Sequence, residues 1–513
     1  MNRSIRLAKV RRAIGASLAS MGLIYATAAC GAGSGSSAAD RTVVLATPTD
    51  LTNWDPAVGG DDLATLFFQT VFSPLLTVNV DLTVSPGIAS VYSYNGTQTS
   101  LTLTIPAGQR FSDETPLDAD AVKRNLDRTM KTKGGSATSL ANITSVTVKS
   151  PTEVVIDLKA PDPGLLFALG RAPGMMVSPR AFGNAKITPV GSGPYVLDQH
   201  ASTRGSRYVF ARNPAYPHPE RYGFDKVELR PMRDFNAMIA ATTSKQVDVG
   251  GVAADGVEPA KAAGLTVKAM PSNVIGMWLV DRGGELAKPL ADVRVRQAIN
   301  HALDADGFIK AISKGGGTRT TQMFAVASQS YDASLDSRYP YDPARARQLL
   351  AEAGYPHGFE LKMPSENAFE PAYYPIVQKQ LAAVGIKVTY IPVAANQIAD
   401  RYLGGEFPAF MWTYSPSDNW LDATYLLSKN GIYNPFHTDD RKVTGLLARI
   451  QKAPRAQQQP LFQQLNRYVV EQAWFAPLNI DPVYITWKPD KVKGTIGDKQ
   501  MFIDLRDFQP LAG

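Results

Sequence analysis

DPARARQLLAEAGYPHGFELKMPSENAFEPAYYPIVQKQLAAVGIKVTYIP, residues 342–392, is the stretch of this chain that decides its fold class. Asp342 supplies a cap, proline takes the first helical position and Gly354 follows the last apolar turn, which predicts a helix over 343–353. Three further elements follow: a strand over 359–363, a helix over 375–384 and a strand over 386–391. Because strand–helix–strand succession is typical of a βαβ unit, we expect an α/β protein with a parallel or mixed sheet.

The chain as a whole has ordinary globular composition. It has 513 residues, of which 44% are hydrophobic and 19% charged, enough for a large bilobal body or several domains. No period of 20–50 residues repeats, which excludes a solenoid. Short strands and capped helices alternate: strands over 43–46, 91–94, 101–105, 146–148, 154–158, 474–480 and 483–487, and helices over 63–72 and 123–130.

The first residues have the anatomy of a secretory signal peptide. Five basic residues and no acidic residue precede position 13, and a stretch of small and aliphatic residues runs over 13–29. This stretch is short and interrupted by Gly15 and Ser17, whereas a membrane span needs about 20 mostly apolar residues. We therefore predict that residues 1–29 direct export.

Cys30 is the only cysteine in the chain, so an intramolecular disulfide is impossible. Ala28 and Ala29 before it resemble a bacterial lipobox, although Thr27 stands where Leu is usual. Residues 30–40 are rich in Gly, Ser and Ala and suit a flexible tether. We predict that Cys30 carries the lipid that anchors an extracytoplasmic protein to the cell membrane; a free or dimer-forming thiol is the alternative.

The location of the basic excess argues against nucleic acid as a partner. Lys and Arg number 53 against 46 Asp and Glu, a formal charge of +7. The five basic residues of the predicted signal peptide account for most of it, and the remainder is close to neutral. A nucleic-acid binder needs a basic patch on its folded body.

Several blocks, in order along most of the chain, resemble the bacterial peptide- and nickel-binding family of extracytoplasmic solute-binding proteins. One departure is Glu114, which stands where Gly is usual. The matching blocks are Leu51–Pro56, Val71–Leu76, Leu101–Pro106, Phe111–Leu117, Asp120–Lys123, Gly191–Tyr195, Arg212–Tyr216, Asp292–Ile299, Leu303-Asp304, Tyr341–Ala344 and Gly354-Tyr355.

The resemblance implies a two-lobed α/β fold, the type II periplasmic-binding-protein fold, with an extra subdomain in the first lobe. Lobe I would take residues 41–275 and 477–513, the extra subdomain about 78–185, and lobe II 276–476. The chain would cross between lobes near 270–280 and 474–480. Solute would be enclosed as the lobes close about a hinge.

The resemblance also implies a ligand site on the strand and loop over 409–418. The family carries a Trp there and, three residues later, an Asp that holds the amino terminus of a peptide. Trp412 matches the Trp, Thr413 follows it, and Ser415 stands in the Asp position. Asp418 can replace the missing carboxylate if the loop is rearranged, and Trp420 lies beside it; core packing for the tryptophans and helix capping for Asp418 are the alternatives.

Other residues complete the expected site or its surroundings. Asn53 and Trp54 lie in the opening loop of the other lobe and are candidates to line the cleft. The Gly191-Ser-Gly193 turn is expected to shape the backbone rather than to contact ligand. Arg294 and Arg296 are expected to be exposed helix charges.

Other classes of protein have less support. The chain lacks G-x-S-x-G, H-E-x-x-H and P-loop motifs, so we expect no enzyme and no cofactor. Its five histidines never pair at i, i+3 or i, i+4, which speaks against a preformed metal site, although a nickel chelate stays an alternative ligand. A glycoside or opine-like solute, or a surface chaperone or adhesive lipoprotein on the same fold, also stays open.

The predicted activity is capture of an oligopeptide-type solute and its delivery to an ABC importer. The expected partners are that peptide or peptide-like solute, the transporter permease, and the membrane through the lipid anchor. We expect the protein to act as a monomer.

Overall fold

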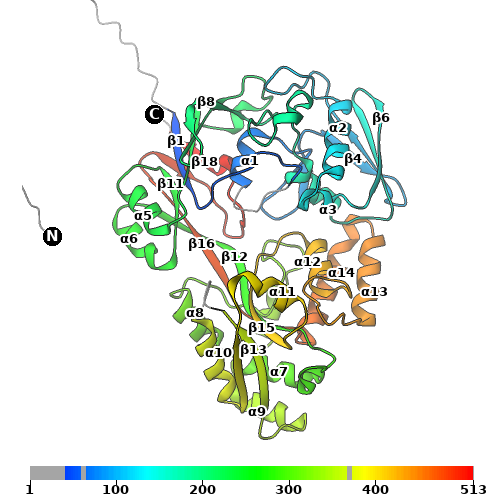
Figure 1. Cartoon of the computed structure of the whole chain (residues 1–513), viewed down its shortest axis with the longest axis vertical. Helices are drawn as coiled ribbons and strands as arrows, with labels where there is room; N and C mark the ends of the chain where they lie inside the picture. Colours follow the sequence, from blue (N-terminus) through cyan, green and yellow to red (C-terminus); the bar gives the residue numbers. More distant parts are fainter. Residues whose placement is uncertain (1–40, 59–64, 367–371, 512–513) are drawn as a thin grey trace, which may run out of the picture. The chain divides into compact units, whose positions relative to one another are not determined.

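Strands from the beginning, middle and end of the chain meet in one eight-stranded mixed sheet (Figure 1). The computed structural model describes residues 41–58, 65–366 and 372–511, which belong to one compact unit. The predicted signal peptide over 1–29, Cys30 and the tether over 30–40 lie outside the described residues.

The sheet has the order β15-β12-β16-β11-β1-β10-β9-β8. β1 pairs in parallel with β10 and β11, and the other neighbours are antiparallel. The strands are β1 (Thr42–Thr47), β8 (Tyr195–Thr203), β9 (Arg207–Arg212), β10 (Lys226–Pro231), β11 (Val249–Val252), β12 (Thr266–Leu279), β15 (Ala409–Tyr414) and β16 (Phe475–Trp487).

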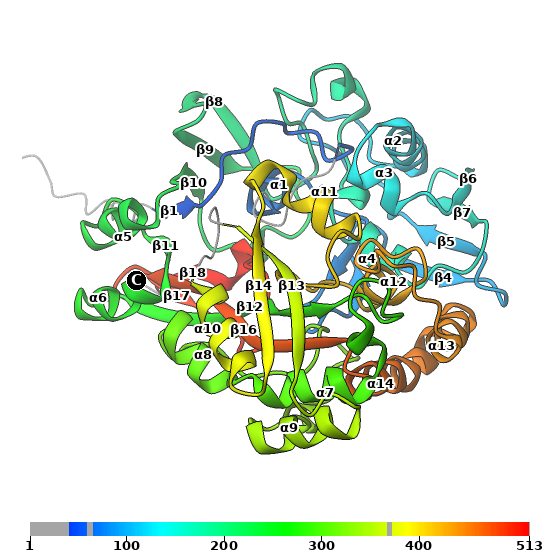
Figure 2. The same cartoon turned by 60° about the horizontal axis from the view of Figure 1, so that its bottom comes forward.

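β12 and β16 are long strands that join the two ends of this sheet (Figure 2). Their pairing shifts register between Pro271 and Asn273 and again between Ile275 and Gly276. The sequence predicted two strands over 474–480 and 483–487, but the structure has one continuous strand. Asp481 and Pro482, which separate the two predicted runs, still pair with β12, so the break in hydrophobicity does not break the strand.

A separate antiparallel sheet, in the order β4-β5-β7-β6, has its own hydrophobic core. The Asn95-Gly96 turn joins β4 to β5 with Tyr94 opposite Leu101, so the loop is longer than two residues. Asp118 caps the covering helix α2 by accepting a hydrogen bond from the N–H of Ala121. The elements are β4 (Val91–Tyr94), β5 (Ser100–Thr104), β6 (Ile143–Ser150), β7 (Glu153–Leu158) and α2 (Ala119–Lys131). We call residues 75–176, which supply this core, the small-sheet region.

The βαβ unit predicted from residues 342–392 is confirmed. β13 (Phe359–Ser365) and β14 (Ile386–Pro392) pair in parallel, with Phe359 opposite Ile386 (Figure 2). The helices are α9 (Pro343–Glu352) and α10 (Tyr373–Ala382). Asp342 accepts from the N–H of Arg345 and caps α9, and Gly354 after it has a positive φ of 91°, which glycine adopts without strain.

The other α-helices and strands described are α1 (Thr65–Val71), α3 (Gly135–Ser139), α4 (Leu165–Leu169), α5 (Phe235–Thr243), α6 (Val257–Ala262), α7 (Val293–Ala302), α8 (Ala305–Ile312), α11 (Ile398–Leu403), α12 (Asn419–Leu427), α13 (Arg441–Lys452), α14 (Arg455–Glu471), β2 (Leu76–Val78), β3 (Val84–Pro86), β17 (Val492–Gly494) and β18 (Phe508–Pro510). Short 3-10 turns lie between them, among them η2 (Ala172–Gly174) after α4 and η6 (Lys288–Ala291) before α7. None of the helices described is long and apolar enough to cross a membrane.

The expected exposure of Arg296 is wrong. Its side chain is 5% exposed and donates to the carbonyl oxygens of Leu290, Ala291 and Gln472. Burial lowers the pKa of Arg296 to about 10. The helix pattern did not reveal this, because the acceptors lie outside α7, in the 3-10 turn before it and at the end of α14.

Candidate functional site

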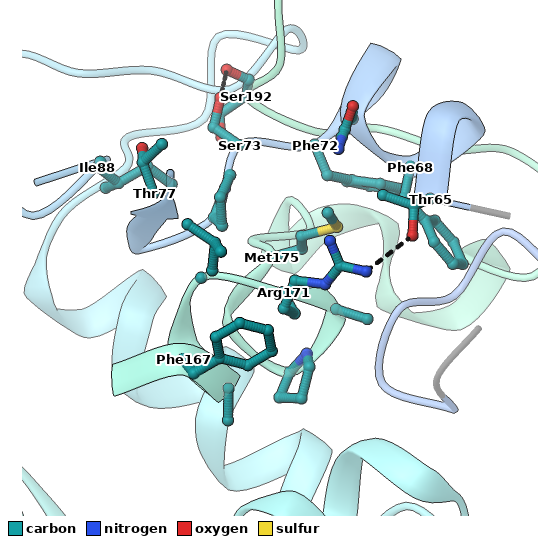
Figure 3. Close-up of a pocket in the computed structure, with 18 of the residues that line it drawn as sticks. Thr65, Phe68, Phe72, Ser73, Thr77, Ile88, Phe167, Arg171, Met175 and Ser192 are labelled. Carbon is teal, nitrogen blue, oxygen red and sulfur yellow. Dashed lines mark hydrogen bonds between the residues drawn. The ribbon is translucent and has the colours of Figure 1, made fainter. Parts of the chain in front are cut away.

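A cavity of about 1280 Å³ is lined by the small-sheet region, α1, the start of α12 and the C-terminal segment, residues 502–506. Figure 3 shows the part of its wall around Thr65, Phe167 and Arg171. The cavity exceeds the roughly 300–1,000 Å³ of a usual small-molecule pocket. Residues that line it include Thr65, Phe68 and Gln69 of α1, Phe167 and Arg171 beside α4, Ser192, the group Ser417, Asp418, Trp420, Leu421 and Thr424 around α12, and Phe502, Asp504 and Arg506.

The Gly191-Ser-Gly193 turn forms part of the wall because its glycines let the backbone approach the end of α1. A Cβ on Gly191 would lie 2.2 Å from the carbonyl oxygen of Val71, and one on Gly193 would lie 2.4 Å from the Val71 carbonyl carbon. A side chain at either position would therefore displace the turn. Ser192 itself lines the cavity, and its carbonyl oxygen accepts from the Ser73 hydroxyl at 3.0 Å (Figure 3).

Arg171 brings a positive charge to this wall. Its guanidinium donates to the Thr65 hydroxyl at 3.4 Å (Figure 3). It also lies 4.3 Å from the ring centroid of Phe502. Stacking on an aromatic ring orients the guanidinium without removing its capacity to donate hydrogen bonds. Sequence reasoning missed this residue because its position depends on packing between α1, η2 and the C-terminal segment.

Asp418 lines the cavity from α12 and also caps that helix. Its Oδ1 accepts from the N–H of Trp420 at 2.9 Å and from that of Leu421 at 3.1 Å. Burial raises the pKa of Asp418 to about 6, with nearby Asp162 adding to the rise, while the two capping N–H groups and Arg455 oppose it. The carboxylate is therefore mostly ionised at neutral pH and protonated in mild acid.

Asp422, one turn further along α12, holds the loop that carries Asp418 through hydrogen bonds. Its side chain accepts from the Tyr414 hydroxyl at 2.7 Å and from the N–H of Ser417 at 3.0 Å. Asp422 is 1% exposed, and burial raises its pKa to about 8. A protonated carboxyl here fixes the loop that carries Asp418, and sequence reasoning gave no signal for it.

Asp162 was also missed, and it belongs to the small-sheet region. Its Oδ1 accepts from the N–H of Gly164 at 3.0 Å, just before α4. Burial raises the pKa of Asp162 above its ordinary value. The Asp-Pro-Gly sequence at 162–164 indicates a helix start. Only the fold brings Asp162 to the same cavity as Asp418.

The other residues predicted on the strand and loop over 409–418 lie outside the cavity lining. Trp412 is half-buried in a cluster with Tyr402 and Phe410, at ring-centroid distances of 5.9 and 6.0 Å. Thr413 is exposed and pairs with Ile275 of β12. Ser415 donates to Oδ1 of Asn273 at 2.5 Å. Of the residues predicted on this segment and the start of α12, the structure brings Asp418 and Trp420 to the cavity.

The opening loop does not bring its predicted residues to the cavity lining described. Trp54 is 3% exposed and packs edge-on against Phe67 and Tyr208, at centroid distances of 5.8 and 5.7 Å. Asn53 accepts from the N–H of Asp55 at 3.0 Å, a local turn contact. The Leu51–Pro56 block thus shapes the core and the turn at this point.

Comparison with known proteins decides the family. Residues 83–434, more than half of the chain, match the family described as bacterial extracellular solute-binding proteins, family 5 middle. The chain belongs to this family. The glutathione-binding protein GsiB of Salmonella choleraesuis (strain SC-B67) is 30% identical over 404 residues, which cover 75% of each chain.

Solved structures share the fold of this family 5 protein. NikA from Brucella suis in complex with Fe(III)-EDTA superposes with a TM-score of 0.78 at 23% identity, covering 91% of this chain and 99% of that one. DppA from Helicobacter pylori in complex with the peptide STSA gives a TM-score of 0.70 at 19% identity, covering 91% and 98%. The predicted two-lobed type II periplasmic-binding-protein fold is confirmed, and at these identities the likeness concerns the fold alone.

Within the described part of this family 5 chain, no three His, Cys, Asp or Glu side chains gather closely enough to hold a metal ion. The cavity instead combines aromatic rings, hydroxyl groups, Arg171 and the carboxylates of Asp162 and Asp418. Such a wall suits an organic solute that offers both apolar groups and hydrogen-bonding partners.

Proposed function

We propose that this protein captures a peptide-type solute in the cavity beside α12 and delivers it to an ABC importer without altering it chemically. The single observation that carries the proposal is the cavity itself. It is roomy, it is lined by aromatic and polar side chains, and its walls come from the small-sheet region on one side and α12 on the other. A solute held there contacts both, so binding and closure are coupled.

The proposed ligand is a short peptide with a free amine. Its amino group would lie at Asp418, whose carboxylate is mostly ionised at neutral pH because its pKa is about 6. A hydrogen bond between an ammonium group and a carboxylate is about twice as strong as a neutral one. Support also comes from the relative at 30% identity, GsiB, which is named for binding the tripeptide glutathione.

We further propose that the protein works outside the cytoplasm, anchored to the membrane through lipid on Cys30. The family is extracellular, and the lone cysteine is followed by a stretch rich in Gly, Ser and Ala before the first described strand at Thr42. A lipid anchor of this kind keeps a binding protein near its permease.

We also propose a division into two lobes. Lobe I takes residues 41–275 and 477–513, and lobe II takes residues 276–476.

The experiment has two steps. Mass spectrometry of solute released from the purified protein identifies what it binds. Small-angle X-ray scattering with that solute, or with a tripeptide that binds, should then show a smaller radius of gyration than the ligand-free protein. Turnover of the added solute, or no compaction at saturating binding, would contradict the proposal.

A further inference from the structure

Arg282 follows the end of β12 and is buried, with 7% of its surface exposed. Its guanidinium lies over the ring of Trp474, 4.1 Å from the centroid, and 5.4 Å from the centroid of Phe475. Nη1 donates to Oδ1 of Asn434 at 3.2 Å. These contacts hold the plane of the guanidinium between the start of β16 and the loop that joins α12 to α13.

One edge of this guanidinium has two donors without an acceptor. Nε and Nη2 of Arg282 are buried and bond to no group of the described residues. Their N–H groups point in parallel from the same edge of the planar side chain, so both can donate to one bound group. A guanidinium offers donors only, and a buried donor left unpaired costs free energy. The edge therefore suits an acceptor that the described part of the chain does not supply.

The charge of Arg282 is also uncompensated. None of its nitrogens bonds a carboxylate of the described residues, and the carboxylate of the adjacent Asp281 accepts instead from three backbone N–H groups. Burial and the nearby charge of Arg296, itself buried, lower the pKa of Arg282 to about 9. Asp292 acts on Arg296 but is bound by Arg294. Two buried cations therefore make this part of the core electropositive.

An anion fits this edge better than a water molecule does. Water would accept from the N–H groups, but it would bring two O–H groups that need acceptors in turn. The acceptor at Arg282, Oδ1 of Asn434, already accepts from Nη1 and from the N–H of Thr438 at 3.2 Å. Trp278, whose ring lies 5.6 Å from that of Phe475, adds a further buried donor, Nε1, without an acceptor in the described chain. An anion only accepts, and it neutralises the buried charge.

We propose that a small monovalent anion, of the size of chloride or nitrate, binds at the Nε–Nη2 edge of Arg282 and stabilises the folded protein. It would join the end of β12 and the start of β16 to the loop after α12. Arg282, Asn434 and Trp474 lie outside the cavity lining described, so this site is separate from the proposed solute site and does not depend on it.

Thermal unfolding in sodium gluconate, sodium chloride and sodium nitrate at equal ionic strength tests the site. Gluconate is too large for a buried site of this kind. An anion that binds only the folded protein multiplies the folded-to-unfolded ratio by one plus its concentration over Kd, about 11-fold at ten times Kd. We expect the unfolding midpoint of the native protein to rise with chloride or nitrate and to level off at saturation.

Two variants separate this site from general salt effects. Arg282→Met removes the charge and keeps most of the apolar volume, so the response to chloride and nitrate should disappear. In gluconate this variant should be at least as stable as the native protein, because it has no unpaired buried charge. Arg449→Met makes the same change at an exposed position of α13 and should respond to the anions as the native protein does.

Anomalous diffraction from crystals of the native protein in sodium bromide locates the anion directly, whether or not Arg282→Met folds. We expect a bromide peak within hydrogen-bonding distance of both Nε and Nη2. A crystal in which only water bonds this edge would overturn the proposal. An equal response to chloride and nitrate in the native protein and Arg282→Met, or no response in the native protein, would overturn it as well.

Discussion

The sharpest test of the binding site replaces Asp418 by Asn. Both capping bonds use Oδ1, and Asn is as good a helix cap as Asp, so α12 keeps its start while the charge is lost. A hydrogen bond to a charged group is worth about 1.5–3 kcal/mol, so a peptide with a free amine should bind roughly 10- to 150-fold more weakly to the variant. Isothermal titration calorimetry at pH 7.5 measures this difference directly.

Acetylation of the peptide completes a double-mutant cycle. The acetylated peptide should bind the native protein about as weakly as the free-amine peptide binds Asp418→Asn, with little further loss when both changes are combined. The pH dependence of peptide affinity is an independent test. The free-amine peptide needs the ionised carboxylate, so its affinity should fall as pH drops below about 6, the pKa of Asp418.

Asp440→Asn is the matched control. Asp440 caps α13 through the N–H groups of Lys442 and Val443, the same geometry as Asp418, but it lies outside the cavity lining described. The reasoning is refuted if free-amine and acetylated peptides bind the native protein equally well. Equal losses of affinity in Asp440→Asn and Asp418→Asn would also refute it.

Three further predictions concern the anchor, the core and the loop that carries Asp418. Cys30→Ala should release the protein into a soluble extracytoplasmic fraction, and unchanged membrane partitioning would remove the case for lipidation. Trp54→Ala should lower the free energy of unfolding by about 3–5 kcal/mol in denaturant titrations, because Trp54 packs in the core, with peptide affinity unchanged under native conditions. Asp422 has a pKa raised to about 8, so the native protein should lose stability relative to Asp422→Asn as pH rises from about 4 to 8; parallel stabilities across that range would contradict the burial of a protonated carboxyl.

Much of the fold follows from local sequence. The helix over 343–353 and the parallel strands after it were predictable because a cap, a proline, a terminal glycine and two short apolar runs all act within one segment. α10 begins two residues before its predicted start, an ordinary uncertainty at helix ends. The strand break predicted at 481–482 failed, because pairing with β12 outweighs the polar and proline residues there.

The candidate site was only partly predictable. Its loop was found through resemblance, and Asp418 and Trp420 do line the cavity, whereas Trp54 and Trp412 pack against other aromatic rings. A tryptophan in an apolar context suits a core and a ligand wall equally well, so the residue type does not distinguish them.

By itself, then, the sequence determined the class of fold, the family and the order of the local elements, because each depends on neighbouring residues or on blocks in a fixed order. Only the tertiary structure decided that Arg171, Asp162 and Asp418 share one cavity and that Arg296 is buried. Those facts depend on contacts between segments more than 100 residues apart, and burial, which sets the pKa of Asp418, exists only once these segments have packed together.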